Sequence, residues 1–303
     1  MLPQAGKRPH IWRIEKDLNP TATSPAIRDT GCMSDYHTLD YKDSEKNRRA
    51  LEQFLSPIEG EQAVFIQAIC KDNTIPDASA DLLANLVSSL RYRVPAFKKY
   101  VDSFMQKAVG NTLNHLYSRG RLPKPPPVVE KLIEEVGIDS ALRCEISNWI
   151  KLKYMMEMAF TNKTAVTFIR QMNAQLYIAP PNRYFITCDD PVAIFHSDYA
   201  RIKPYGVGLA TKGIEVSVPI SRKHLIKLTW EGTEGVVQAT PAEVCEYNRR
   251  SIVMAKTQIF SPEKDDQLLN EIGALSHSFA GYRLSNLKHE NGSVMITTFI
   301  PVE

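Results

Sequence analysis

The spacing of apolar residues changes partway along the chain, and this change limits the folds open to it. Before about residue 160 the apolar positions recur every three or four residues, as in Leu51, Phe54, Leu55 and Ile58, which predicts amphipathic helices. After about residue 164 the repeat shortens towards two, which predicts strands. Helices grouped ahead of strands are typical of α+β proteins, since β-α-β folds interleave them.

We therefore expect one α+β domain over residues 1–303, in which a helical layer packs on a mixed or antiparallel sheet. The helical part is expected at about 48–160 and the sheet-rich part at about 164–303. The stretch 121–127 holds four prolines and is either a stiff linker or a surface loop within the helical layer. We interpret it as a loop, because helical periodicity resumes directly at residue 128.

Individual elements follow from the same patterns. Helices are expected at 48–70 (with a kink or a new turn at Pro57), 82–93, from Pro95 to near Gly110, 128–136, 140–158, 242–260 and 265–275. Strands are expected at 11–15, 175–179, 184–187, 192–195, 214–220, 224–230 and 235–239. Asn291-Gly292 predicts a hairpin turn between strands 281–287 and 294–301.

The composition sets limits on function and location. Charged residues make up 23% of the chain and the net charge is +3, too small to indicate a nucleic-acid partner by itself. No apolar run approaches the roughly 18 residues of a membrane helix, so no membrane contact is expected. Five widely spaced cysteines without a C-x-x-C pair argue against a disulfide scaffold or a zinc knuckle. We expect a cytoplasmic protein.

Two adjacent acids form the most distinctive local signal. Asp189 and Asp190 follow a predicted buried strand and precede Pro191, which ends strand pairing. Buried acids are costly unless they are hydrogen-bonded, paired or functional. They are either a metal-binding or general-base pair, with Asp189 as the ligand of a divalent metal ion, or a structural turn in which Asp accepts backbone N–H bonds.

Other side chains could complete such a site. Glu59 borders an apolar helical stretch and is the third candidate catalytic acid, while Arg91 and Arg93 are candidate substrate-binding cations that equally suit a helix end. His37 and His196 are weaker candidates for a base, and packing explains them as well. Cys188 has no cationic neighbour in sequence, which predicts an inert buried thiol.

Nucleic acid is a second open question. Basic residues cluster near the proline-rich stretch with tyrosines between them: Lys98, Lys99, Lys107, Arg119, Arg121 and Lys124, with Tyr92, Tyr100 and Tyr117. A nucleic-acid binder uses such a pattern, and a solvated helical face also explains it. The sequence contains no Walker A, G-x-G-x-x-G, G-x-S-x-G or H-E-x-x-H motif.

Several short motifs, in order, resemble the family of domain of unknown function 4238, whose members are mostly bacterial and uncharacterised. They are Ile11–Glu15 with Ser24-Pro25 and Tyr36-His37-Thr38, then Leu51–Glu59, Phe185–Val192, Val218–Ser221 and Glu243–Arg249 with Asn248. Phe185–Val192 is similar to the family's Phe-Ile-Thr-Ser-Asp-Asn-Pro-Val. The resemblance spans roughly residues 11–260 and implies no established activity.

The chain departs from that pattern in two places. The family's opening His-Tyr-Val-Pro-Gln segment has only an echo in Leu2-Pro3-Gln4, so we expect a truncated start or a lost element. If the opening histidine serves an active site, this copy is expected to be impaired. Cys188 and Asp190 stand where the family has Ser and Asn. The extra charge beside Asp189 is expected to raise a pKa of the pair by repulsion.

Two functions remain open at this point. The first is a hydrolase, assisted by a metal ion or by acid–base chemistry, that acts on a phosphodiester or nucleic acid through Asp189 with Asp190 or Glu59. The second is a non-enzymatic bacterial interaction or defence module in which the acidic turn is structural. Substrate, partners and oligomeric state do not follow from the sequence.

Overall fold

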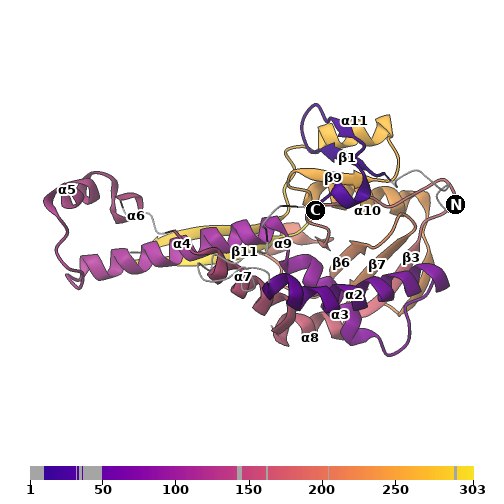
Figure 1. The fold of residues 1–303 in the computed structure, drawn as a ribbon, viewed down its shortest axis with the longest axis horizontal. Coiled ribbons are helices and arrows are strands. Elements are labelled where there is room, and N and C mark those ends of the chain that lie inside the picture. Colours follow the sequence, from indigo (N-terminus) through magenta and orange to yellow (C-terminus); the bar gives the residue numbers. More distant parts are fainter. Residues whose placement is uncertain are drawn as a thin grey trace.

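The computed structural model describes residues 10–31, 33, 36, 50–141, 145–161, 163–203, 205–289 and 292–303. The chain is an α+β protein, as the sequence predicts, with most helices ahead of the larger sheet (Figure 1). In the described part of the chain, no helix has the length and apolar character needed to cross a membrane.

The helical half runs from α2 to α8. Its helices are α2 (Ala50–Asp72), α3 (Ala80–Tyr92), α4 (Pro95–Ser118), α5 (Pro127–Val136), α6 (Ile138–Ala141), α7 (Asn148–Met156) and α8 (Lys163–Gln171), with a π-helical turn at Glu157–Thr161. Helix α2 continues through Pro57 as one element. Helix α4 passes Gly110, so the predicted stop there is wrong. A glycine inside a helix costs only about 1 kcal/mol, and contacts of α4 with α6 and α7 offset this cost.

A five-stranded sheet forms the centre of the second half. Its order is β5-β6-β7-β3-β8, from β3 (Asn173–Ile178), β5 (Ala193–His196), β6 (Ile214–Pro219), β7 (His224–Thr229) and β8 (Gly235–Gln238). All pairs are antiparallel except β3 with β8, which is parallel. Buried apolar residues of α3 and of this sheet, such as Leu83, Val87, Leu176 and Val216, share one core.

A second, four-stranded sheet has the order β2-β1-β9-β4. It joins β1 (Trp12–Glu15) and β2 (Ala22–Thr23) to β4 (Thr187–Cys188) and β9 (Gln258–Ser261). Beside it lie α10 (Pro241–Met254) and α11 (Asp266–Ala274), while α9 (Tyr199–Ile202) follows β5 and a 3₁₀ turn spans Ile27–Asp29. A capping box of Thr240 and Glu243 fixes the start of α10.

Two predictions around this sheet need correction. The helix expected at 242–260 ends at Met254, and the chain then forms β9 between β1 and β4. Of the strand expected at 184–187, only Thr187 is paired as a strand. The preceding backbone bonds to a side chain instead, because the Asn248 amide donates to Tyr184 O and accepts from Ile186 N.

The long helix α4 and the C-terminal hairpin form an arm. Figure 1 shows α4 leaving the body, the hairpin of β10 (Gly281–His289) and β11 (Gly292–Ile300) lying along it, and α5 and α6 at its far end. The predicted hairpin forms, but its register differs from the prediction: Asn291-Gly292 as the two turn residues would pair 290 with 293, whereas His289 pairs with Gly292. The turn itself lies outside the described residues. Tyr100 of α4 stacks on Tyr282 of β10 with ring centroids 4.5 Å apart.

Candidate functional site

Asp189 joins two segments that are far apart in the sequence. Its carboxylate accepts hydrogen bonds from the backbone N–H groups of Lys256 (2.8 Å), Thr257 (2.9 Å) and Gln258 (3.3 Å), and from Thr257 Oγ1 (2.7 Å). A carboxylate has about four acceptor positions; three of these donors bind Oδ2 and one binds Oδ1. Asp189 therefore satisfies the backbone where the chain leaves α10 and enters β9, which explains why the helix ends there.

Asp190 has a different environment from its neighbour. Asp190 is only 8% exposed, and the Lys256 Nζ lies 3.7 Å from the Asp190 Oδ2. Burial raises the pKa of the Asp190 carboxyl from 3.8 to about 6, although the positive charges of Lys256 and Arg91 oppose this rise. At near-neutral pH this carboxyl therefore exchanges a proton readily, which an ordinary surface aspartate does not.

Arg91 connects the end of α3 to the arm. Its buried guanidinium donates to Tyr282 Oη at 3.1 Å and lies 4.5 Å from the centre of the Phe299 ring. Its Nε finds no hydrogen-bond partner among the described residues. Arg91 is thus a buried cation that is held mainly by aromatic rings, with Asp190 among the charges close enough to act on it.

Two lysines that the sequence analysis did not identify lie beside the acids. The Lys256 Nζ donates to Ala280 O and is 4.6 Å from the centre of the Phe279 ring. The Lys16 Nζ donates to the carbonyl oxygens of Val253, Ala255 and Ser278. Burial and the nearby charge of Lys256 lower the pKa of Lys16 to about 8. The site therefore holds more positive charge than the acidic sequence motif suggests.

A cavity of about 690 Å³ opens at the root of the arm. Its charged lining consists of Arg91, Lys99, Lys107, Asp189, Asp190 and Lys256, and its aromatic lining of Phe97, Tyr100, Phe279, Tyr282 and Phe299. Three of the predicted residues, Arg91, Asp189 and Asp190, thus meet at one cavity. Lys256, Phe279 and Tyr282 carried no sequence signal, because their role depends on contacts with residues far away in the chain.

The other two predicted site residues do not line this cavity. Glu59 of α2 forms an ion pair with Arg93, which follows α3, with 2.5 Å between Oε1 and Nη2. Arg93 also donates to Ser89 Oγ at 3.1 Å. This pair links α2 to the end of α3, while the Nε of Arg93 has no hydrogen-bond partner among the described residues.

The weaker candidates have structural surroundings. The Nε2 of His196 lies 3.1 Å from Lys212 O, and its Nδ1 accepts from Asp198 N at 3.1 Å. Cys188 is buried, and burial raises the pKa of its thiol, which fits the predicted inert thiol. His37 lies outside the described residues.

The described residues contain no group of three or more His, Cys, Asp or Glu side chains placed to hold a metal ion. A metal ion at Asp189 would share its oxygens with the backbone donors that already bind them. The proposed metal ligand at Asp189 remains a prediction. The acid with free capacity facing the cavity is Asp190.

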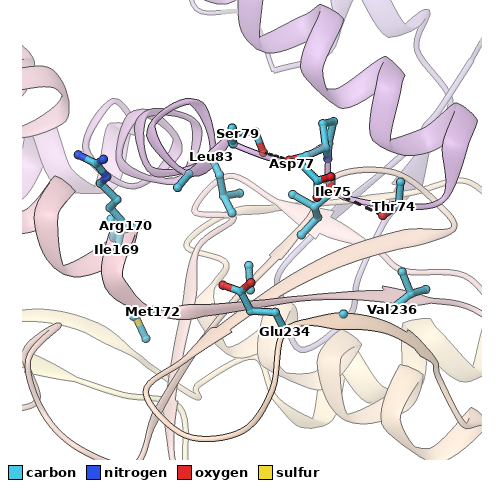
Figure 2. Close-up of a pocket in the computed structure, with 15 residues that line it drawn as sticks. Thr74, Ile75, Asp77, Ser79, Leu83, Ile169, Arg170, Met172, Glu234 and Val236 are labelled. Atoms are coloured by element: carbon cyan, nitrogen blue, oxygen red, sulfur yellow. Dashed lines mark hydrogen bonds between the residues drawn. The ribbon is translucent and has the colours of Figure 1, made fainter.

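A smaller cavity of about 340 Å³ lies between the loop that precedes α3, the end of α8 and the start of β8 (Figure 2). Its charged lining residues, Asp77, Arg170 and Glu234, are all exposed, and Arg170 pairs with Asp81 at 3.2 Å. None of the predicted site residues reaches it. It lacks the buried ionisable group that distinguishes the cavity at Asp190.

These features define an α+β protein with an acidic turn against a cationic and aromatic cavity. The sequence profile of the proteins of unknown function DUF4238 matches residues 5–265, and the chain belongs to that family. Neither the curated proteins nor the solved structures contain a significant match to the chain.

Proposed function

We propose that the protein is a hydrolase of phosphate esters in which Asp190 is the acid–base group. The observation that carries this proposal is a buried carboxyl on the wall of the large cavity, 3.7 Å from an ammonium group, with a pKa of about 6. General acid–base catalysis is most efficient when the pKa of the group lies near the working pH. The lysines and the arginine of the same lining fit an anionic substrate.

In the proposed reaction the Asp190 carboxylate accepts a proton from a water molecule while the water oxygen forms a bond to phosphorus. The bond from phosphorus to the leaving oxygen breaks, and the proton passes from Asp190 to that oxygen. Lys256 offsets the negative charge on the non-bridging oxygens. Asp189 contributes as a positioning residue, because it fixes the backbone of Lys256.

The test uses bis(p-nitrophenyl) phosphate as a small diester substrate. Asp190→Asn is expected to lower kcat by about a hundredfold or more, and the wild-type rate is expected to change with pH around the pKa of Asp190. Glu59→Gln is the matched control, because it neutralises an acid outside the cavity, and it should leave kcat unchanged. An Asp190→Asn enzyme with the wild-type kcat would rule out this role.

A second candidate, a binding module without catalysis, is favoured by the four hydrogen bonds that Asp189 accepts from residues 256–258. Calorimetry with magnesium or manganese on the wild type and on Asp189→Ala separates it from a metal-assisted hydrolase. We expect no heat of metal binding, and a loss of about 3 kcal/mol in the free energy of unfolding of Asp189→Ala because charge-assisted hydrogen bonds are lost. Metal binding by the wild type that disappears in a stable Asp189→Ala variant would support the metal-assisted form instead.

We also propose that the protein works in the bacterial cytoplasm. Cys70, Cys188 and Cys245 are free thiols, as the reducing cytoplasm keeps them. Localisation of a tagged full-length chain in a bacterial host checks this part of the proposal.

A further inference from the structure

We infer that the substrate is single-stranded nucleic acid, which runs from the large cavity along one ridge of α4. This inference rests on the proposed function, because it names the substrate class of the same cavity. Its basis is the combination of a polar and basic ridge on the arm, an exposed aromatic side chain at the cavity and the acid–base group between them.

The ridge consists of α4 residues spaced four apart, followed by the residue that ends the helix. Its members are Lys99, Ser103, Lys107, Asn111, His115 and Arg119. Residues at this spacing form one continuous ridge on a helix. The ridge winds around the helix by about 40° at each step, so Arg119 lies about half a turn around α4 from Lys99, and a bound strand would follow this winding. Every member is a cation or a hydrogen-bond donor. All of them are exposed except Asn111, which is half-buried. The sequence places no acid on this ridge.

The charges of the ridge are available to a ligand. Lys99, Lys107 and Arg119 form no ion pair with any described residue, and the Lys107 Nζ makes one long hydrogen bond, to Leu284 O at 3.4 Å. The single acid within α4, Asp102, is neutralised by Lys151 at 3.0 Å and accepts from Gln106 at 3.1 Å. Lys99 and Lys107 also line the cavity, so the ridge begins at the proposed catalytic acid.

The length of the ridge distinguishes a polymer from a small ligand. Twenty residues of helix separate Lys99 from Arg119, which corresponds to about 30 Å at 1.5 Å per residue. A mononucleotide would fill the cavity and leave the outer half of the ridge without a partner. A chain of phosphates contacts the cations along its whole length.

An aromatic side chain favours a single strand over a duplex. Phe279 lines the cavity and is 47% exposed, with the Lys256 Nζ 4.6 Å from its ring centre. An unpaired base stacks on such a ring beside a cation that binds phosphate. In a duplex the bases already stack on one another and their faces are closed to the protein. The position of Phe279 beside Lys256 places a stacked nucleotide next to Asp190.

The experiment measures fluorescence anisotropy of a labelled single strand of about twelve nucleotides, a length typical of single-strand grooves. Lys107→Glu/Arg119→Glu is expected to weaken binding about tenfold or more and to reduce the salt dependence by about one phosphate contact per residue. Phe279→Ala is expected to weaken binding by about tenfold through lost stacking. Lys131→Glu/Lys153→Glu is the control, because it makes the same change of charge on exposed lysines of α5 and α7.

Three results would overturn the inference: no binding of the single strand, equal loss of affinity in the ridge and control variants, or equal affinity for the duplex or for inorganic polyphosphate. Hydrolysis of the small diester without single-strand binding would remove the inference and leave the proposed function intact. If the single strand binds and the ridge variants weaken this binding, but no diester is cleaved, the binding site stands and the proposed hydrolase activity is wrong. Asp190→Asn should bind the strand at least as well as the wild type, since it removes a negative charge.

Discussion

Asp189 and Asp190 are adjacent in the chain, but they are held in opposite ways. Asp189 faces backbone N–H donors that stabilise its charge, whereas Asp190 is buried with an ammonium group at 3.7 Å as its nearest ion pair. A buried carboxylate without a full set of donors costs free energy in its ionised form. Asp189 therefore contributes to stability, whereas the ionised form of Asp190 costs stability, as expected for the acid–base role that we propose for it.

This difference predicts that Asp190→Asn stabilises the fold. The folded-state pKa of Asp190 is raised from 3.8 to about 6, so the stability that this group contributes is full below about pH 4 and is lost as the pH rises through 6. In Asp190→Asn the side chain stays neutral at every pH, so no buried carboxylate lowers the stability above pH 6. Above pH 6 we expect Asp190→Asn to be more stable than the wild type by up to about 3 kcal/mol, from about two pKa units at 1.36 kcal/mol each.

Urea unfolding on both sides of pH 6 checks this prediction. The two proteins should differ above pH 6 and converge towards pH 4, while Glu61→Gln, at an exposed position on α2, should follow the wild type at both. A less stable Asp190→Asn above pH 6 would mean that the ion pair with Lys256 outweighs the cost of burial.

The elements themselves were largely predictable from local pattern. Apolar spacing located most helices and most strands, because each of those segments buries one face against a neighbour. It missed α8, and the single helix that it predicted at 140–158 is divided into α6 and α7 in the structure. It failed at 255–260, which was predicted as the end of a helix but leads into a strand, because the Asp189 carboxylate accepts hydrogen bonds from backbone N–H groups that begin 67 residues away. It failed again at Tyr184, whose backbone bonds to the side chain of Asn248 rather than to a strand.

One histidine links two connecting segments between elements. The Nε2 of His224, at the start of β7, lies 2.8 Å from Asn73 Oδ1, and its Nδ1 lies 2.8 Å from Ser221 Oγ. Asn73 follows α2 in the left-handed region, with φ of 53°. The neutral imidazole can donate to the first partner and accept from the second. His224 thereby joins the loop after α2 to the turn between β6 and β7.

This link predicts a loss of stability in mild acid. Burial and, to a lesser degree, the charge of Lys223 lower the pKa of His224 below its ordinary value of 6.5. The unfolded chain therefore takes up a proton first, and the stability that this group contributes is full above pH 6.5 and is lost as the pH falls through the folded-state pKa.

The expected loss appears in unfolding midpoints recorded as the pH falls from about 7.5 to about 5, on either side of the ordinary histidine pKa. The wild type should lose more stability over this range than His224→Gln. His115→Gln, at an exposed position on α4, should keep the wild-type slope. If His224→Gln also keeps that slope, the acid sensitivity arises elsewhere.

At the scale of the whole molecule, the cavity exists only where the arm meets the body. Asp189, Asp190 and Lys256 belong to the body, whereas Lys99, Tyr100 and Lys107 belong to α4, and Tyr282 belongs to the hairpin. The acids and Arg91 were predictable as candidates because ionisable residues next to apolar segments are unusual. Their partners were not, since no local pattern indicates that the C-terminal hairpin packs along α4.

Arg91 connects the hairpin of the arm to Asp190, because the hairpin holds its guanidinium and its charge lowers the pKa of Asp190. Replacing Arg91 should therefore change the pKa of Asp190. Its positive charge lowers the pKa of Asp190 against the effect of burial, and its guanidinium is held by Tyr282 and Phe299 of the hairpin. Arg91→Met fills similar space without charge, and such replacements of buried ions often keep the fold. We expect the pKa of Asp190 to rise above 6 in Arg91→Met and to stay near 6 in Arg91→Lys, as measured by carboxyl ¹³C NMR titration. An unchanged pKa in a folded Arg91→Met protein would show that the hairpin contributes only shape to the site, because the buried cation would then have no electrostatic effect on the acid.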